Sequence, residues 1–248
     1  MLETIQLQKK LLRKLKSVYG KFKVASYNTS GYWDYNIYPS ENASWYLEHD
    51  ALSDRMIMKD EIVIESDLSM MQMNRGITRQ HEKKLLENHI GFETWYSGNK
   101  SFHTHTTFPE LLKLPLSECN TIKRLFILWL YDFDDKKCAS HKIDMQLCSN
   151  HLIRLEYACH PMTGIRKRLT NEHELDVDNK LPVEVWLRYN EIKSKYKPAV
   201  YNNMSQKYCI KYLLSTPIED GRHRVAFVLF KVLKNSKGVD DKYLIQYL

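Results

Sequence analysis

The 248-residue chain has no long apolar run. Its longest stretch of apolar residues covers 125–131, far short of the ~20 residues that a membrane-spanning helix needs. The N-terminus has no uncharged core of the kind found in a secretory signal, because basic residues interrupt its leucines; these are Lys9, Lys10, Arg13, Lys14 and Lys16. These absences exclude a membrane partner and predict a cytoplasmic location.

Glycine, proline and patterned cysteine are also scarce. The chain has only 8 glycines and 7 prolines, below the usual ~7% and ~5%, which excludes collagen-like and low-complexity classes. Its 5 cysteines are an odd number without framework spacing, so we expect reduced thiols rather than disulfides. The chain is 43% hydrophobic, enough to bury a core, and general disorder is excluded.

Positive charge is in excess. Lys and Arg number 37 against 30 Asp and Glu, which gives a formal net charge of +7. A polyanion such as a nucleic acid is the natural partner of such a surface.

Periodicity predicts an α+β domain over residues 1–181 followed by a helical module over 182–248. In the first part, helical spacing covers 4–19, 78–89, 108–116 and 121–131. Strand patterns cover 23–27, 33–37, 61–68, 93–95, 101–107, 142–147, 152–159 and 168–170. Beyond Pro182 the expected helices are 184–195, 206–214, 222–234 and 240–248. The last one runs to the final residue without a C-cap, as expected of a fragment of a longer protein.

A strand that ends in two acids is the first candidate site. Side chains alternate across a strand, so Glu65 and Asp67 would project from one face. Two carboxylates with open positions suit Mg²⁺ or Mn²⁺ that holds a phosphate. The alternative is a solvated loop, because Asp132/Asp134 and Asp176/Asp178 have the same spacing.

The second candidate begins with a turn at Ser97-Gly98. Beyond it Ser101, His103 and His105 would share one strand face, where a hydroxyl and imidazoles suit phosphate oxygens. The alternatives are ordinary polar strand residues or metal-binding histidines. Zinc is not expected, because Cys138-x-x-His141 with Cys148 fits no standard finger and lacks a fourth ligand.

The third block contains Asp144 after an apolar residue, then Leu152-Ile-Arg154 and His160-Pro-Met-Thr163-Gly164. The order of the three blocks resembles the archaeo-eukaryotic primase superfamily, which includes primase small subunits and plasmid-type primase-polymerases. In that family an acid-x-acid strand precedes Ser-x-His, a lone Asp, and an Arg-Leu strand with a His and Thr-Gly turn. The chain departs from the pattern at Glu156-Tyr157-Ala158, where Pro-Gly-Ser is usual, and at Met162, where Lys is usual.

The resemblance implies a catalytic domain with an RRM-like mixed β-sheet that acts as a DNA primase or primase-polymerase. Its reaction would be template-directed nucleotidyl transfer in DNA replication, as in plasmids and mobile elements. The implied metal ligands and catalytic residues are Glu65, Asp67 and Asp144, holding two Mg²⁺ or Mn²⁺ ions. The implied nucleotide-binding residues are Lys100, Ser101, His103, Arg154 and His160.

A fainter resemblance covers the helical module, where Asp220-Gly221-Arg222-His223-Arg224 precedes an apolar helix. It implies that Arg222, His223 and Arg224 bind template during initiation. The implied partners are single-stranded DNA, nucleoside triphosphates and a helicase or other replication proteins. Two alternatives stay open: a non-catalytic accessory replication subunit that keeps the fold, and a metal-dependent phosphodiester hydrolase.

Overall fold

The computed structural model describes residues 2–27, 32–149, 151–173 and 179–195. The chain divides into two compact units, Met1–Ile192 and Lys193–Leu248. The three helices expected after residue 195 lie outside the described residues, and so do Arg222, His223 and Arg224. No helix among the described residues is both long enough and apolar enough to cross a membrane.

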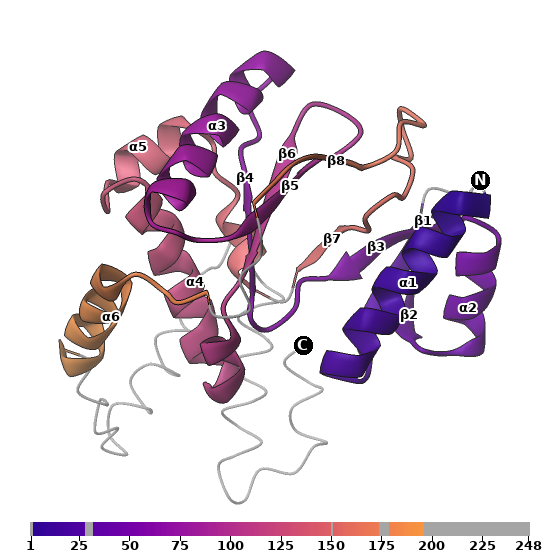
Figure 1. Ribbon diagram of the computed structural model, residues 1–248, viewed down its shortest axis with the longest axis horizontal. Coiled ribbons are helices and arrows are strands. Elements are labelled where there is room, and N and C mark those ends of the chain that lie inside the picture. The colour runs from indigo at the N-terminus through magenta and orange to yellow at the C-terminus, as the bar shows by residue number, and fades with distance from the viewer. Residues whose placement is uncertain (1, 28–31, 150, 174–178, 196–248) are drawn as a thin grey trace, which may run out of the picture. The chain divides into compact units, whose positions relative to one another are not determined.

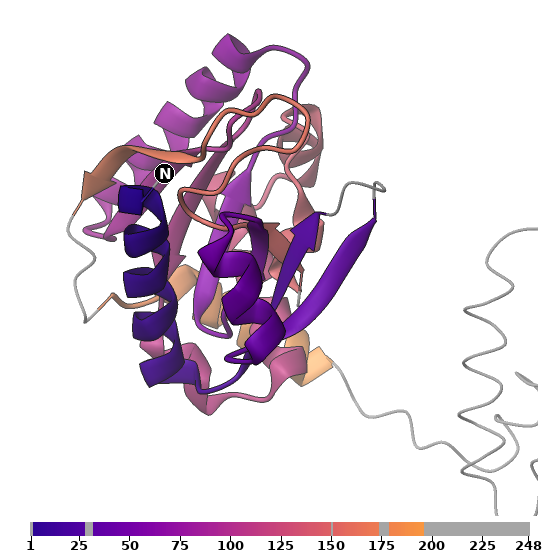
Figure 2. The same cartoon turned by 90° about the vertical axis from the view of Figure 1, so that its right-hand side faces the viewer.

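The N-terminal part of the first unit is a four-stranded antiparallel sheet with two helices. The strand order is β2-β1-β3-β7. Its elements are α1 (Leu2–Tyr19), β1 (Phe22–Tyr27), β2 (Trp33–Tyr38), α2 (Glu41–Glu48), β3 (Leu52–Met56) and β7 (Leu152–Arg154). Figure 1 shows α1 and α2 together beside β1 and β2, and Figure 2 is turned so that these helices face the viewer.

The core of this part follows the strand alternation. Phe22 and Val24 are buried on one face of β1, where they pack with Leu12 of α1 and Leu47 of α2. Lys23 between them is exposed. One face of the sheet is therefore covered by helices, and the other face is left for different contacts.

The rest of the unit is built around a second antiparallel sheet, β4-β6-β5-β8. Its strands are β4 (Glu61–Glu65), β5 (Phe92–Tyr96), β6 (Phe102–Thr107) and β8 (Arg168–His173). The helices around it are α3 (Met71–Glu87), η1 (Pro109–Lys113), α4 (Leu116–Leu130), α5 (Asp135–Ser140), η2 (Met145–Cys148) and α6 (Val183–Lys195). The apolar stretch of α4 supplies much of the larger core, including Ile122 and Phe126, which are fully buried.

The α+β class predicted from the sequence is confirmed. The strands are divided between two sheets, and every pairing between named strands of the described residues is antiparallel, where the resemblance implied one mixed sheet. The hairpin around Ser97-Gly98 forms as expected, whereas the buried strand expected over 61–68 ends at Glu65, so that Asp67 lies beyond it. The patterns did not reveal α2, β3 or α5.

Three expected elements are shorter or different in the structure. Residues 142–147 contribute only the bridge between Ser66 and Ile143, because Asp144 accepts the Gln146 N–H and starts η2. The expected strand 152–159 ends at Arg154. The expected helix 108–116 is the short 3₁₀ helix η1, because Pro115 disfavours helical geometry at Leu114.

The first compact unit extends to Ile192, whereas the expected boundary was at residue 181. Helix α6 is the reason, because Val185 and Tyr189 are buried in the larger hydrophobic core. Leu181 belongs to the same core. The module beyond this helix stays a prediction.

A buried ionic network joins the two sheets. The guanidinium of Arg55 on β3 binds Glu61 on β4 through two hydrogen bonds, both 2.8 Å long. Its Nε and Nη2 groups donate to Glu156, at 2.9 and 2.8 Å, and Nη1 also donates to the Met56 carbonyl at 3.1 Å. Burial raises the pKa of Glu61, but Arg55 lowers it more, so the net pKa is well below the usual range. Burial lowers the pKa of Arg55, but Glu156 and Glu61 hold it above its usual range.

Two further buried side chains complete this network. His105 Nδ1 lies 2.7 Å from a Glu61 oxygen, and Lys167 Nζ lies 3.3 Å from a Glu156 oxygen and 3.2 Å from His105 Nε2. All five side chains are nearly inaccessible to solvent. The charges therefore compensate one another inside the protein.

We expect Arg55→Met to lower the free energy of unfolding by about 3–5 kcal/mol, because it leaves Glu61 and Glu156 buried without their main cation. Urea unfolding followed by circular dichroism measures the change. The control Arg188→Met removes an exposed Arg188–Glu191 ion pair and should cost about 1 kcal/mol or less. Similar losses in the two variants would show that the network does not stabilise the fold.

Stability should also fall in mild acid. Burial lowers the pKa of His81 to about 3, and burial together with Lys167 lowers the pKa of His105 to about 4. The unfolded chain therefore takes up these protons first, at a pKa of about 6.5, and stability falls as the pH drops below that value. The urea concentration at the midpoint of unfolding should therefore decrease as the pH falls from about 7 to 5. The carboxylates of the unfolded chain titrate below this range, near pH ~4.3.

His81→Gln should remove part of this decrease, because the variant has no buried imidazole at that position to keep neutral. His89→Asn, at an exposed position, is the matched control and should retain the full decrease. A pH dependence unchanged by His81→Gln would contradict the assignment.

Candidate active site

One pocket of about 270 Å³ gathers residues from all three sequence blocks. The eight residues that the family resemblance implied for metal and nucleotide binding in the described part of the chain line it: Glu65, Asp67, Lys100, Ser101, His103, Asp144, Arg154 and His160. These residues come from β4, from the β5–β6 hairpin, from the segment before η2 and from β7 with the turn after it. Side chains that are spread over about a hundred positions of the sequence therefore line one pocket.

Backbone hydrogen bonds place the segments that carry the three acids side by side. The segment after β4 bridges to residue 143, with Asp144 N donating to Glu65 O at 3.0 Å. Asp67 N donates to Lys142 O at the same distance. The third acid is therefore held against the acid-x-acid motif by the main chain, although it lies on no regular strand.

Glu65 is paired with His103 across neighbouring strands. The two residues are directly opposite in the β4–β6 register, and His103 Nε2 lies 3.5 Å from a Glu65 carboxylate oxygen. Burial raises the pKa of Glu65, but His103 outweighs this effect and lowers it to about 2. Glu65 is thus ionised at neutral pH. His103 Nδ1 is buried and has no hydrogen-bond partner among the described residues.

The other two acids have partners of their own. Asp67 is exposed and forms an ion pair with Lys100, whose Nζ is 2.9 Å from the carboxylate. The main chain at Lys100 is fixed by α3, because Asn74 Nδ2 donates to the Lys100 carbonyl at 2.9 Å. Asp144 Oδ1 accepts the Gln146 N–H at 2.9 Å.

No three His, Cys, Asp or Glu side chains in the described part of the chain are gathered as ligands of a metal ion. This finding includes the carboxylate trio, because Asp67 turns to Lys100 and Asp144 to the start of η2. It also includes Cys138, His141 and Cys148. The donor chemistry of the trio nevertheless fits a hard divalent cation, since three carboxylates line one solvent-open pocket beside a shared main-chain bridge.

Two turns close the other side of the pocket. The 97–101 turn and the 160–165 turn touch, with Thr163 Oγ1 donating to the Gly98 carbonyl at 2.6 Å. His160 N donates to Ile165 O at 2.8 Å, and burial lowers the pKa of the His160 imidazole. This contact brings His160 to the same pocket as Lys100.

Arg154 is oriented by the chain that follows it, because its Nη1 donates to the Cys159 carbonyl at 3.0 Å. Glu156, where the resemblance implied a proline, is a member of the buried network rather than of the pocket. Met162 is exposed and does not line the pocket.

The sequence patterns assigned some residues incorrectly and missed others. His105 does not line the pocket, because its ring is bound to Glu61 and Lys167 in the buried network. His151 and Asn99 line the pocket, and no spacing pattern pointed to them. Lys167, whose Nζ donates to the Arg154 carbonyl at 2.8 Å, was missed as well.

The remaining acid-x-acid pairs have structural partners or lie outside the described residues. Asp134 caps α5 through the N–H groups of Lys136 and Lys137. Asp132 binds Lys84 at the surface. Asp176 and Asp178 fall in the part of the chain that is not described.

Two solved structures are similar to the chain in fold. One is the polymerase domain of Mycobacterium tuberculosis ligase D in complex with DNA, with 12% identity and a TM-score of 0.44 over 69% of this chain and 82% of that one. The other is the primase RepB', with 11% identity and a TM-score of 0.44 over 98% of this chain and 85% of that one. No family model and no curated protein sequence matches the chain.

We expect Gly98→Ala to disturb the contact between the two turns. Gly98 has a φ of +94°, and an added Cβ would lie 2.4 Å from the Ile165 carbonyl oxygen and 3.1 Å from His160 Cβ. The predicted loss of unfolding free energy is about 1–3 kcal/mol, measurable by urea unfolding.

Gly76→Ala is the matched control, because a Cβ on this helical glycine meets nothing within 4 Å. That substitution should be neutral or stabilise by about 0.5–1 kcal/mol. Equal effects at the two glycines would show that the turns do not depend on their close approach.

Proposed function

We propose that the chain is a DNA primase or primase-polymerase that makes primers on single-stranded DNA by template-directed nucleotidyl transfer. The observation that supports this proposal most strongly is the single pocket lined by all eight residues that the resemblance implied for catalysis and nucleotide binding. Those residues come from three separate blocks of the sequence. Their meeting at one pocket is difficult to explain if the blocks were unrelated.

In this proposal Glu65, Asp67 and Asp144 hold two Mg²⁺ or Mn²⁺ ions. Such ions lower the pKa of an attacking hydroxyl and stabilise negative charge on phosphate oxygens. Glu65 supplies a carboxylate whose pKa His103 lowers to about 2, which favours the ionised form at neutral pH. Asp67 supplies a solvent-accessible carboxylate, which is paired with Lys100 in the structure.

The basic side of the pocket suits the triphosphate of an incoming nucleotide. Lys100 and Arg154 provide fixed positive charge there, and His103 provides a buried ring nitrogen with no partner among the described residues. Ser101 adds a hydroxyl group, which donates to Ser97 Oγ at 2.9 Å. Alignment and charge stabilisation dominate phosphoryl chemistry, so no nucleophilic side chain is required.

Two other functions would use parts of the same site. An accessory subunit that keeps the fold has no need of three acids at one pocket, and a phosphodiester hydrolase does not call for the Ser-x-His and Arg-Leu blocks. Incorporation of labelled nucleotides on a single-stranded template, with and without a primer, separates all three. We further propose that the helical module, with Arg222, His223 and Arg224, binds template during initiation and that a helicase or other replication protein is a partner.

Asp67→Asn and Asp144→Asn should each reduce nucleotide incorporation by about 100-fold or more, because each removes a carboxylate that the metal ions need. Both positions are at the pocket surface, so the urea midpoint should stay close to that of the wild type. Incorporation is measured with Mg²⁺ and with Mn²⁺ on a primed and an unprimed template.

Asp132→Asn is the control for the loss of one surface carboxylate, since Asp132 pairs with Lys84 away from the pocket. This variant should keep wild-type incorporation. Full activity of either pocket variant would overturn the metal assignment, and absence of incorporation by the wild type under all conditions would overturn the proposed reaction.

A further inference from the structure

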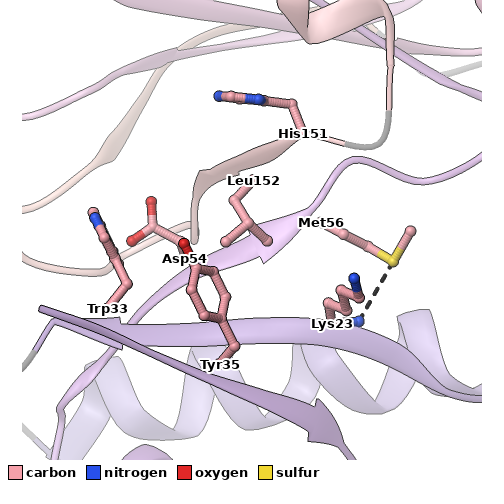
Figure 3. Close-up of a pocket in the computed structure, with 7 residues that line it drawn as sticks. All are labelled: Lys23, Trp33, Tyr35, Asp54, Met56, His151 and Leu152. Carbon is pink, nitrogen blue, oxygen red and sulfur yellow. Dashed lines mark hydrogen bonds between the residues drawn. The ribbon is translucent and has the colours of Figure 1, made fainter. Parts of the chain in front are cut away.

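A second pocket, of about 450 Å³, lies on the open face of the β2-β1-β3-β7 sheet, away from α1 and α2. Its lining residues are Lys23, Trp33, Tyr35, Asp54, Met56, His151 and Leu152. Figure 3 shows the side chains of Trp33 and Tyr35 from β2 and of Asp54 from β3 projecting into the same space. His151 and Leu152 line the candidate active site as well, so the two pockets adjoin.

The strand register continues this face into the active site. Tyr35 is opposite Ala25, Ala25 is opposite Asp54, and Asp54 is opposite Arg154. Residues directly opposite one another in antiparallel strands project from the same face. One row across four strands therefore leads from an aromatic ring, past the small side chain of Ala25, to an acid and then to Arg154 of the active site.

Large aromatic side chains are exposed at the outer end of this row. Tyr35 is 63% exposed and Trp33 is 38% exposed. Trp33 is supported on one edge by Tyr27, with ring centroids 5.2 Å apart. Flat rings held open to solvent on a sheet are suited to stacking against a planar ligand.

Asp54 gives the pocket a specific polar group. Its side chain is only 6% exposed, and Oδ2 is buried with no hydrogen-bond partner in the described residues. Burial raises the pKa of this carboxyl group. A buried acceptor without a partner costs about 1–3 kcal/mol, and a ligand N–H group that reaches Oδ2 would remove this cost.

We propose that this pocket binds an unpaired base of a single-stranded nucleic acid, with Trp33 and Tyr35 stacking on the base and Asp54 Oδ2 accepting a hydrogen bond from its exocyclic amino group. The inference rests on the proposed function and locates the strand that the active site copies. Lys23 at one side of the pocket and Arg154 beyond Asp54 supply positive charge for the phosphates before and after the base.

The chemistry of Asp54 also predicts a preference among bases. Cytosine presents an amino group on its pairing edge, whereas thymine presents two carbonyl oxygens around one N–H. The carboxylate would attract the first edge and repel the oxygens of the second. We therefore expect oligocytidylate to bind more tightly than oligothymidylate of the same length, by about 3- to 10-fold, as for a single well-placed polar contact.

The test is fluorescence anisotropy of the full chain with these two labelled oligonucleotides at one fixed, low salt concentration. Trp33→Ala should weaken both complexes by about tenfold, which corresponds to ~1.4 kcal/mol, as expected for one lost stacking contact. Trp33→Phe should restore most of the affinity. Trp45→Ala is the matched control, because Trp45 is 54% exposed on α2, on the helical side of the sheet, and should have no effect.

Asp54→Asn tests the base contact separately. The amide donates as well as accepts, so the preference for oligocytidylate should fall to about twofold or less while affinity for oligothymidylate is kept or rises. The urea midpoint of each variant is compared with that of the wild type. If Trp33→Ala proves unstable, the comparison of Trp33→Phe with Trp45→Ala still tests the proposal.

Equal losses from Trp33→Ala and Trp45→Ala would overturn the proposal, and so would an unchanged base preference in Asp54→Asn or the absence of any strand binding by the wild type. Binding of free nucleotide with no affinity for the oligonucleotides would overturn it as well. Asp67→Asn separates this inference from the proposed function, because it should abolish incorporation and leave strand affinity unchanged. Strand binding that depends on Trp33 in a chain without incorporation activity would contradict the proposed reaction alone.

Discussion

The contact between Arg55 and two buried glutamates determines how the two sheets meet. Arg55 lies on β3, Glu61 begins β4, and Glu156 follows β7 closely. A guanidinium whose bidentate partners come from both sheets tolerates little displacement, because any loss leaves a charge unpaired in the interior. The start of β4 and the end of β7 are consequently held at a defined separation. Arg154 lies at that end of β7, and Glu65 lies at the opposite end of the short strand β4.

The candidate active site is a product of that junction. The acids come from the end of β4 and the segment that bridges to it, while Arg154 comes from the neighbouring sheet. Lys167 links the network to the site directly, since its Nζ binds the Arg154 carbonyl as well as Glu156. A site built at such a junction can combine acids at the end of one sheet with Arg154 from the other. It also opens toward the aromatic face of the first sheet, where the second pocket lies.

Local capping explains why some elements differ from their patterns. Residues 142–147 alternate as a strand would, but a short acid that accepts an N–H two residues later favours a turn. Glu156 illustrates the opposite case, because a residue that looked like a departure from a family turn is buried as a partner of Arg55. A single sequence does not distinguish a lost motif residue from one that has a structural role.

The sequence alone determined the α+β class, the amphipathic N-terminal helix, a buried strand beginning at Glu61 and the residue types of the candidate site. These features depend on local periodicity and on motif order, which are visible in one dimension. The tertiary structure alone decided that Asp144 bridges to β4, that His105 joins the interior network, and that Asp54 is left buried without a partner for Oδ2. The reason is separation along the chain: Arg55 and Glu156 are 101 positions apart, and no local pattern encodes which distant side chains will share a buried charge.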